Sequence, residues 1–318
     1  MNTVTGKSVE VLNQEIEDLY SSFVESKRSE LFTEHSDKAD AFSKIIMIYL
    51  GKILAYQNDI KNNLHKFYGD FMSIKVIQLV YLTWKTGDEK NSEVEYSYED
   101  LKDISVLPGV FSPRFASDSY LWAKYMVDSG IVKDKVVLEM GAGTGVISLY
   151  LSLYGNIKSI VAADINDQAI KNINLNIKKH NIDTAKFEVK KSNLFSSFDN
   201  SYTFDIIFWA YVWLKLEDEE IVKIIDIEAD QNIKRLLNSI TDNQYQMLKK
   251  FLLESKQHLT KGGKLLLITS DFLPNNEVKE MAEDLGYNFK IEKFTQNSEV
   301  VKGANMVLDL YQITLSLS

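Results

Sequence analysis

The sequence contains no cysteine, and it has only three prolines and four histidines among its 318 residues. Without cysteine the chain can form no disulfide framework, thiolate zinc site, iron–sulfur cluster or cysteine nucleophile. The histidines, His35, His65, His180 and His258, are scattered and show no metal-ligand spacing. We therefore expect no metal site.

Basic residues are fewer than acidic ones, 36 against 45, so the net charge is −9. Because an acidic surface repels phosphates, we predict no nucleic-acid partner. Long apolar runs are also missing. The stretch from Ile45 to Tyr56 is interrupted by Gly51 and Lys52 and falls short of the roughly 20 residues of a membrane span. The first residues lack the apolar core of a secretory signal, so we predict a soluble, cytoplasmic protein with no membrane partner.

Residues 1–107 contain no proline and show helical patterning in three runs, at about 8–34, 37–67 and 70–86. In the second run, apolar residues from Phe42 to Leu54 form a wide face. A polar loop follows, and a short helix is expected near 97–104. We interpret 1–107 as a helical domain that forms a substrate lid, binds a partner or makes a homodimer.

From Pro108 the pattern changes to alternating strands and helices. The expected helices are 115–129, 144–154, 166–180 and 275–285, and the expected strands are 136–140, 158–164, 186–191, 202–210 and 264–270. Two further strands at the end of the chain, with no helix between them, would form a hairpin at one edge. This alternation predicts an α/β domain over 108–318, with a doubly wound, mostly parallel sheet of seven strands.

The strongest motif is VVLEMGAGTG, residues 136–145, where a buried strand runs into a glycine-rich turn. Gly141, Gly143 and Gly145 permit unusual backbone angles and close approach to a ligand. Their G-x-G-x-G spacing differs from the G-x-G-x-x-G of dinucleotide sites, because Val146 takes the place of the last glycine. Glu139 stands two residues before the first glycine. The loop therefore favours a ligand with an ammonium group and no pyrophosphate.

Asp164 ends the next strand, 19 residues beyond Gly145. A carboxylate at that place can accept hydrogen bonds from both hydroxyls of a ribose. The alternative is that Asp164 caps the helix that starts near Asn166.

Residues 136–164 resemble the S-adenosylmethionine site of class I methyltransferases, and the resemblance extends over about 108–318. It implies a Rossmann-like methyltransferase fold that binds S-adenosyl-L-methionine and releases S-adenosyl-L-homocysteine. It also implies that Glu139 holds the methionine end of the cofactor, and that Asp164, with Ile165 beside it, binds the ribose. The family often places an Asp against the adenine after the third strand. Here Asn193, with Leu194 beside it, takes that place, or else supports a turn.

The segment 110–126 resembles, more narrowly, the lead-in of release-factor glutamine methyltransferases, which also carry a helical N-terminal domain. The resemblance implies that the pairs Pro113-Arg114 and Asp118-Ser119 lie over the cofactor and that Arg114 meets the substrate. Arg114 pairing with surface acids is the alternative.

At the end of the fourth strand, those relatives carry N-P-P-Y, which holds a planar amide or amine. Here the four positions are Ala210, Tyr211, Val212 and Trp213, so the asparagine and both prolines are missing. Trp209, Tyr211 and Trp213 instead suggest an aromatic substrate pocket that attracts a ring or a cationic amine. Tyr211 is the candidate catalytic residue. The alternative is that these aromatics belong to the core.

An insertion follows at 214–244, and its acidic run at 217–220 either attracts a cationic substrate or is a solvated helix start. We predict an S-adenosylmethionine-dependent methyltransferase that acts on a small molecule or peptide in specialised metabolism, with nitrogen favoured over oxygen as acceptor. The alternatives are a protein methyltransferase, a non-catalytic cofactor-binding module, and a nicotinamide oxidoreductase, which Val146 disfavours.

Overall fold

A computed structural model describes most of the chain after residue 39. The described residues are 40–56, 60–88, 92–115, 118–210, 214–229, 231–269, 275–301 and 304–317. The predicted helical run at 8–34 lies outside these ranges.

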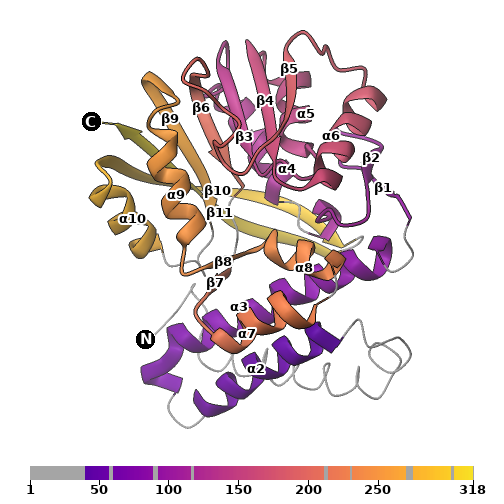
Figure 1. Ribbon diagram of the computed structural model, residues 1–318, viewed down its shortest axis with the longest axis vertical. Helices are drawn as coiled ribbons and strands as arrows, with labels where there is room; N and C mark the ends of the chain where they lie inside the picture. The colour runs from indigo at the N-terminus through magenta and orange to yellow at the C-terminus, as the bar shows by residue number, and fades with distance from the viewer. Residues whose placement is uncertain are drawn as a thin grey trace.

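A seven-stranded sheet lies at the centre of the structure (Figure 1). Its strands, in spatial order, are β10 (Tyr287–Val301), β11 (Ala304–Leu317), β9 (Leu259–Thr269), β6 (Phe204–Trp209), β3 (Val136–Met140), β4 (Ser159–Asp164) and β5 (Phe187–Lys191). Neighbouring strands from β9 to β5 are parallel, whereas β11 is antiparallel to both β9 and β10. The predicted doubly wound sheet with a hairpin at one edge is confirmed.

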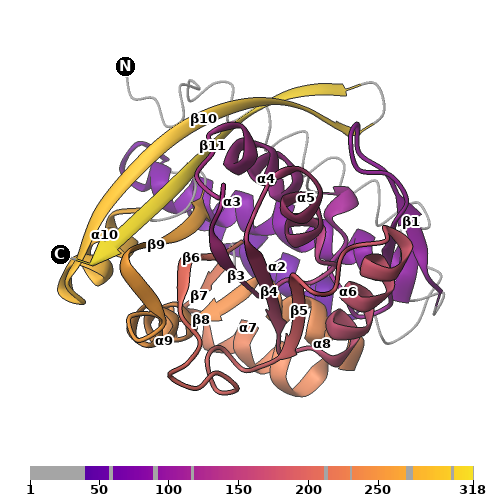
Figure 2. The same ribbon diagram turned by 90° about the horizontal axis from the view of Figure 1, so that it is seen from above.

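Helices cover both faces of this sheet, as the view in Figure 2 shows. One face carries α4 (Asp118–Asp128), α5 (Val146–Tyr154) and α6 (Asp167–Lys179), and the other carries α9 (Gln246–Ser255) and α10 (Asn275–Asp284). The central strands are therefore apolar on both sides. In β6, for example, Ile206 and Phe208 pack into one layer and Ile207 and Trp209 into the other. Polar groups that serve a ligand are left to the carboxyl ends of the strands.

A helical lobe beneath the sheet is built from two segments that are far apart in the sequence (Figure 1). The first contains α2 (Asp40–Tyr56), α3 (Ile60–Thr83) and a π-helical turn, Trp84–Asp88. The second is the insertion after β6, with β7 (Leu214–Leu216), α7 (Glu219–Lys223), a π-helical turn (Ile224–Glu228), α8 (Gln231–Asn238) and β8 (Thr241–Asn243). Both segments bury their apolar residues in one core, to which Phe42, Ile77 and Leu236 belong. The division of the chain at 107/108 stays a prediction.

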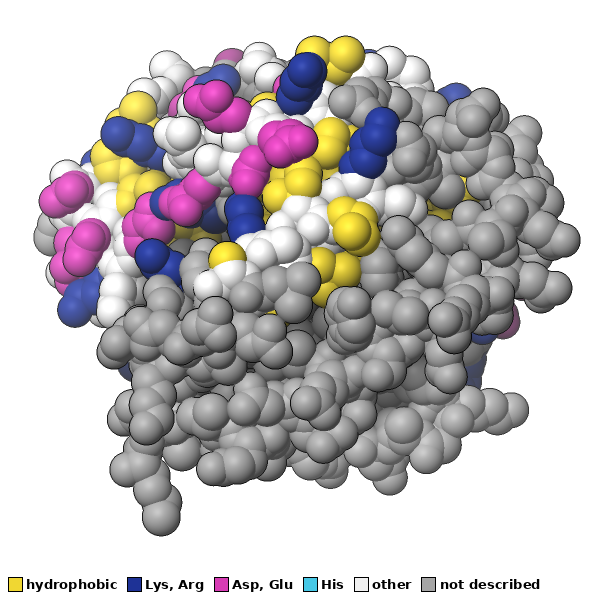
Figure 3. Space-filling view, turned by 90° about the horizontal axis from the view of Figure 1, so that it is seen from below, with side chains coloured by type: hydrophobic (Ala, Val, Ile, Leu, Met, Phe, Trp, Pro, Cys, Tyr) yellow, Lys and Arg dark blue, Asp and Glu magenta, His cyan; other side chains and the backbone are white. Residues whose placement is uncertain are grey.

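The outer face of this lobe carries charges of both signs in its described part (Figure 3). Two ion pairs, Lys52–Asp218 at 2.8 Å and Lys234–Asp226 at 3.1 Å, belong to the lobe. No helix among the described residues is long and apolar enough to cross a membrane.

The segment before α4 forms two short strands, β1 (Val94–Tyr96) and β2 (Ile104–Val106), and the helix predicted near 97–104 is wrong. The reason lies in two buried asparagines of α6. The backbone N–H of Ser105 donates to Oδ1 of Asn176 at 2.9 Å, and that of Leu107 donates to Oδ1 of Asn172 at 2.7 Å. Because side chains of α6 satisfy this backbone, it stays extended. Asn166 continues the contact, since its Nδ2 donates to the carbonyl of Gly109 at 2.7 Å.

Candidate functional site

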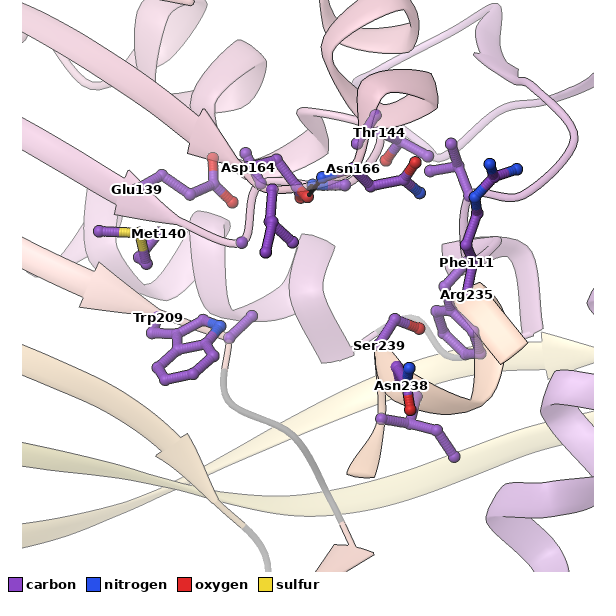
Figure 4. Close-up of a pocket in the computed structure, with 18 of the residues that line it drawn as sticks. Phe111, Glu139, Met140, Thr144, Asp164, Asn166, Trp209, Arg235, Asn238 and Ser239 are labelled. Atoms are coloured by element: carbon purple, nitrogen blue, oxygen red, sulfur yellow. Dashed lines mark hydrogen bonds between the residues drawn. The ribbon is translucent and has the colours of Figure 1, made fainter. Parts of the chain in front are cut away.

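A cavity of about 480 Å³ opens where the carboxyl ends of β3, β4 and β6 face the helical lobe. Its walls come from the glycine-rich loop, the ends of the three strands, α8, and residues 109–113, which include the start of the lead-in. Figure 4 shows Glu139 and Asp164 on one side and Arg235, Asn238 and Ser239 on the other. The cavity therefore has one wall from the sheet and one from the insertion.

The three glycines of the loop all have positive φ, but each has a different surrounding. A Cβ at Gly141 would lie 2.6 Å from Nε1 of Trp209, and one at Gly145 would lie 3.2 Å from Cγ1 of Ile173. Gly145 does not line the cavity and packs the loop against α6 instead. A Cβ at Gly143 would meet nothing within 4 Å. Gly143 is thus the glycine whose missing side chain leaves open space for a ligand.

Asp164 is buried at the end of β4 and lines the cavity. Its Oδ2 accepts from the N–H of Gly143 at 2.9 Å, and its Oδ1 accepts from the N–H of Asn166 at 2.8 Å. The helix-cap alternative is wrong, because the side chain of Asn166 caps α6 by accepting from the N–H of Gln168 at 3.0 Å. Burial raises the pKa of Asp164. Each carboxylate oxygen keeps acceptor capacity for a ligand hydroxyl.

Glu139 is 2% exposed and lies between β3 and the first turn of α5. The N–H of Ser148 donates to its Oε2 at 2.9 Å, and the hydroxyl of Ser148 donates to the same oxygen. Burial is the largest influence on this carboxyl, and it raises the pKa to about 8. A buried acid with this pKa gains its charge readily when a cation binds beside it.

The loop after β5 contributes Ser192, Asn193 and Leu194 to the cavity wall. Ser192 was not predicted, and it holds the loop, since its hydroxyl donates to the carbonyl of Leu194 at 2.5 Å and accepts from the N–H of Ser197 at 3.1 Å. Asn193 is exposed, and its side chain makes none of these bonds. Ile165, 59% exposed, lies on the same wall.

The lead-in reaches the cavity through Pro113, Ser119 and Phe111, of which Phe111 was not predicted. Arg114 and Asp118 are not among the lining residues. Asp118 directly precedes the lining residue Ser119 in the sequence. Burial of the Asp118 carboxyl raises its pKa to about 7.

The aromatic wall is only partly described. Trp209 lines the cavity, yet it is 9% exposed and its ring packs edge-on against Phe251 with 4.9 Å between centroids. It belongs to the core and to the site at once. Tyr211 and Trp213 lie outside the described residues, so the substrate role of both and the catalytic role of Tyr211 stay predictions.

The acidic run 217–220 does not line the cavity. Asp218 caps α7 by accepting from the N–H of Glu220 at 3.0 Å, and it also forms the ion pair with Lys52. The run is therefore a solvated helix start.

Comparisons with known proteins bear on this site. Residues 102–209 match the family model of the methyltransferase small domain. A relative from Methanocaldococcus jannaschii, named for protein N5-glutamine methylation, is 32% identical over 188 residues, which cover 59% of this chain and 86% of the relative. The chain belongs to the class I S-adenosylmethionine-dependent methyltransferases. Its activity is methyl transfer, and its cofactor is S-adenosylmethionine.

The names of other similar proteins give RNA as their substrate. The ribosomal RNA small subunit methyltransferase C of Proteus mirabilis is 24% identical over 62% of this chain and 49% of the relative. A solved structure of the Thermus thermophilus 16S rRNA N2 G1207 methyltransferase with AdoMet and guanosine has a TM-score of 0.47 and 14% identity, and it covers 71% of this chain and 50% of that one.

These relatives correct one prediction. The exclusion of nucleic acid as a partner is wrong, because rRNA methyltransferases are among the relatives of this chain. The exclusion rested on a net charge of −9, which averages over 318 residues and says nothing of the surface around one cavity.

The described residues fit the cofactor of the family. Gly143 leaves space at the loop, Asp164 presents two carboxylate oxygens, and Glu139 offers a buried acid for a cation. S-adenosylmethionine supplies an activated methyl group on a positively charged sulfur. We assign these residues to its binding as a proposal, together with Ile165, Asn193 and Leu194.

Replacing Gly143 with alanine tests the assignment. The positive φ costs about 1 kcal/mol of stability, and the new methyl group occupies space that the ligand needs, so cofactor affinity should fall about tenfold or more. Gly130 is a matched control, because it has φ +70, meets nothing within 4 Å and lies outside the cavity. Thermal unfolding and calorimetry should show similar destabilisation in both variants and weaker binding only in Gly143→Ala. Equal loss of binding would mean that backbone strain is the cause.

Proposed function

We propose that this methyltransferase modifies a side-chain nitrogen of a protein or peptide. The observation that supports this most is the relative named for glutamine methylation, which this chain matches over 86% of the relative's length. The lead-in, which resembles that of release-factor glutamine methyltransferases, also reaches the cavity, because Phe111 and Pro113 lie in the cavity wall. The relatives lend no support to a role in specialised metabolism. The predicted cytoplasmic location stays a prediction.

The chain's part in such a transfer is to orient the acceptor and to exclude water. The cavity lies between the sheet and the lobe, so an acceptor side chain entering it is enclosed from both sides. Ala210 lines this cavity where relatives of the glutamine type carry an asparagine. It offers no side-chain group to hold an amide, so other residues of the wall must bind the polar groups of the acceptor.

A labelling experiment tests the proposal. The protein is incubated with methyl-labelled S-adenosylmethionine and lysate of cells that lack its gene, and the products are separated by size after protease or RNase treatment. We expect large labelled products that protease destroys and RNase leaves intact. Label that RNase removes would show an RNA acceptor, and label confined to small products that protease leaves unchanged would show a small-molecule acceptor. Either result would overturn the proposal.

A further inference from the structure

The two walls of the cavity differ in charge. The sheet wall carries carboxyl groups, Glu139 and Asp164, and these face the cofactor in our assignment. The opposite wall comes from α8 and the turn after it, with Arg235, Asn238 and Ser239 (Figure 4). Arg235 is the only cationic residue on the described wall.

α8 holds these side chains in a fixed place. Ile233, Leu236 and Leu237 are fully buried in the core of the lobe, so the other face of the helix is directed toward the cavity. Arg235 packs against Gly109, the residue just before the lead-in, since a Cβ at Gly109 would lie 3.7 Å from Cδ of Arg235. The cation therefore lies where α8 and the lead-in meet.

The guanidinium retains donors for a ligand. Its Nη1 donates to Oδ1 of Asn232 at 3.1 Å, which engages one of five N–H groups. It forms no ion pair with a carboxylate of the described residues. Asp167 also lines the cavity, but it pairs with Lys191 at 2.6 Å, which is the main cause of its lowered pKa, with Arg235 a minor one.

We propose that α8 is the acceptor-recognition element and that Arg235 binds a carboxylate of the peptide next to the methylated nitrogen. The planar guanidinium suits a carboxylate, with which it forms two parallel hydrogen bonds. Asn238 adds an amide that can donate and accept on the same wall, whereas Ala210 cannot. This inference rests on the proposed function, because it assumes a peptide acceptor.

Peptide arrays with methyl-labelled S-adenosylmethionine test the inference. Each peptide carries one central glutamine, and the flanking positions are aspartate, alanine or lysine. The wild-type protein should label aspartate-flanked peptides about tenfold more than lysine-flanked ones. Arg235→Gln should lose this preference, and Arg235→Glu should reverse it. Cofactor affinity, measured by calorimetry, should stay unchanged in both variants.

Lys234→Gln is the matched control. Lys234 is the preceding residue on α8, but it pairs with Asp226 and does not line the cavity. Its variant should keep the wild-type preference. Labelling without any preference for flanking charge would overturn the role of Arg235 and would leave the proposed function standing. No labelling of any peptide by the wild-type protein would overturn this inference, whereas the proposed function falls only if the lysate experiment also gives no protease-sensitive label.

Discussion

Asp164→Ala is expected to weaken binding of S-adenosylmethionine by at least ~100-fold. In our assignment the carboxylate accepts from two ribose hydroxyls, and hydrogen bonds to a charged group contribute about 1.5–3 kcal/mol each. The same side chain also accepts from the N–H groups of Gly143 and Asn166, so its loss loosens the loop as well. Calorimetry with S-adenosylmethionine and S-adenosylhomocysteine should show a similar loss for both, because the two share the ribose.

Asp183→Ala is the control for this variant. Asp183 also accepts a backbone N–H, that of Ala185 at 3.0 Å, but it is exposed and outside the cavity. Its variant should bind the cofactor as the wild-type protein does. Unchanged affinity in Asp164→Ala would show that the ribose lies elsewhere and that the assignment of the site is wrong.

The cofactor wall could be predicted from the sequence because its parts are local. Glu139, Gly143 and Asp164 lie on two adjacent strand-to-turn junctions, and parallel strands bring their carboxyl ends together whatever the rest of the chain does. The predicted sheet was confirmed for the same reason, since each strand carries its own apolar signal.

The acceptor wall could not be predicted in this way. The spacing of Ile233, Leu236 and Leu237 indicates an amphipathic helix, but it does not say what the polar face meets. That depends on how the insertion packs against α2 and α3, about 150 residues earlier in the chain. The short helix predicted near 97–104 was wrong for a similar reason, because Asn172 and Asn176 on α6 bind the backbone at Ser105 and Leu107 and hold β2 extended there.

Glu139→Gln should remove the pH dependence that the protein gives to cofactor binding. Burial places the pKa of Glu139 at about 8, so the free protein holds this group protonated at neutral pH. If the carboxylate faces the cofactor's ammonium, binding releases the proton, and the protein's contribution to the affinity rises about 20-fold between pH 6.5 and 8.5. Deprotonation of the ligand's own amine, whose pKa is about 8, lowers the affinity over the same range. The variant should show only the titration of the ligand's own amine. A ratio of wild-type to variant affinity that does not change with pH would contradict this role.

The same variant should stabilise the free protein, and the sign follows from the direction of the shift. The pKa of Glu139 in the folded protein, about 8, lies above its value of about 4.3 in the unfolded chain. Between about pH 4.3 and pH 8 the native state therefore binds a proton that the unfolded state has lost. The free energy of unfolding of the wild-type protein falls as the pH rises through this range. Glutamine does not titrate. Urea unfolding should therefore show similar stability for both proteins near pH 4.5 and a gain of a few kcal/mol for Glu139→Gln above pH 8.

Ser148→Ala separates this account from a simple loss of packing. The hydroxyl and the N–H of Ser148 both donate to Oε2 of Glu139, and each lowers the pKa that burial raises. Removing the hydroxyl leaves the charged form with one donor fewer, so the pKa should rise further. The pH at which affinity reaches half of its maximum should then move upward from the wild-type value, while the affinity at high pH is kept. A uniform loss at every pH would mean that Ser148 acts on packing and not on the charge of Glu139.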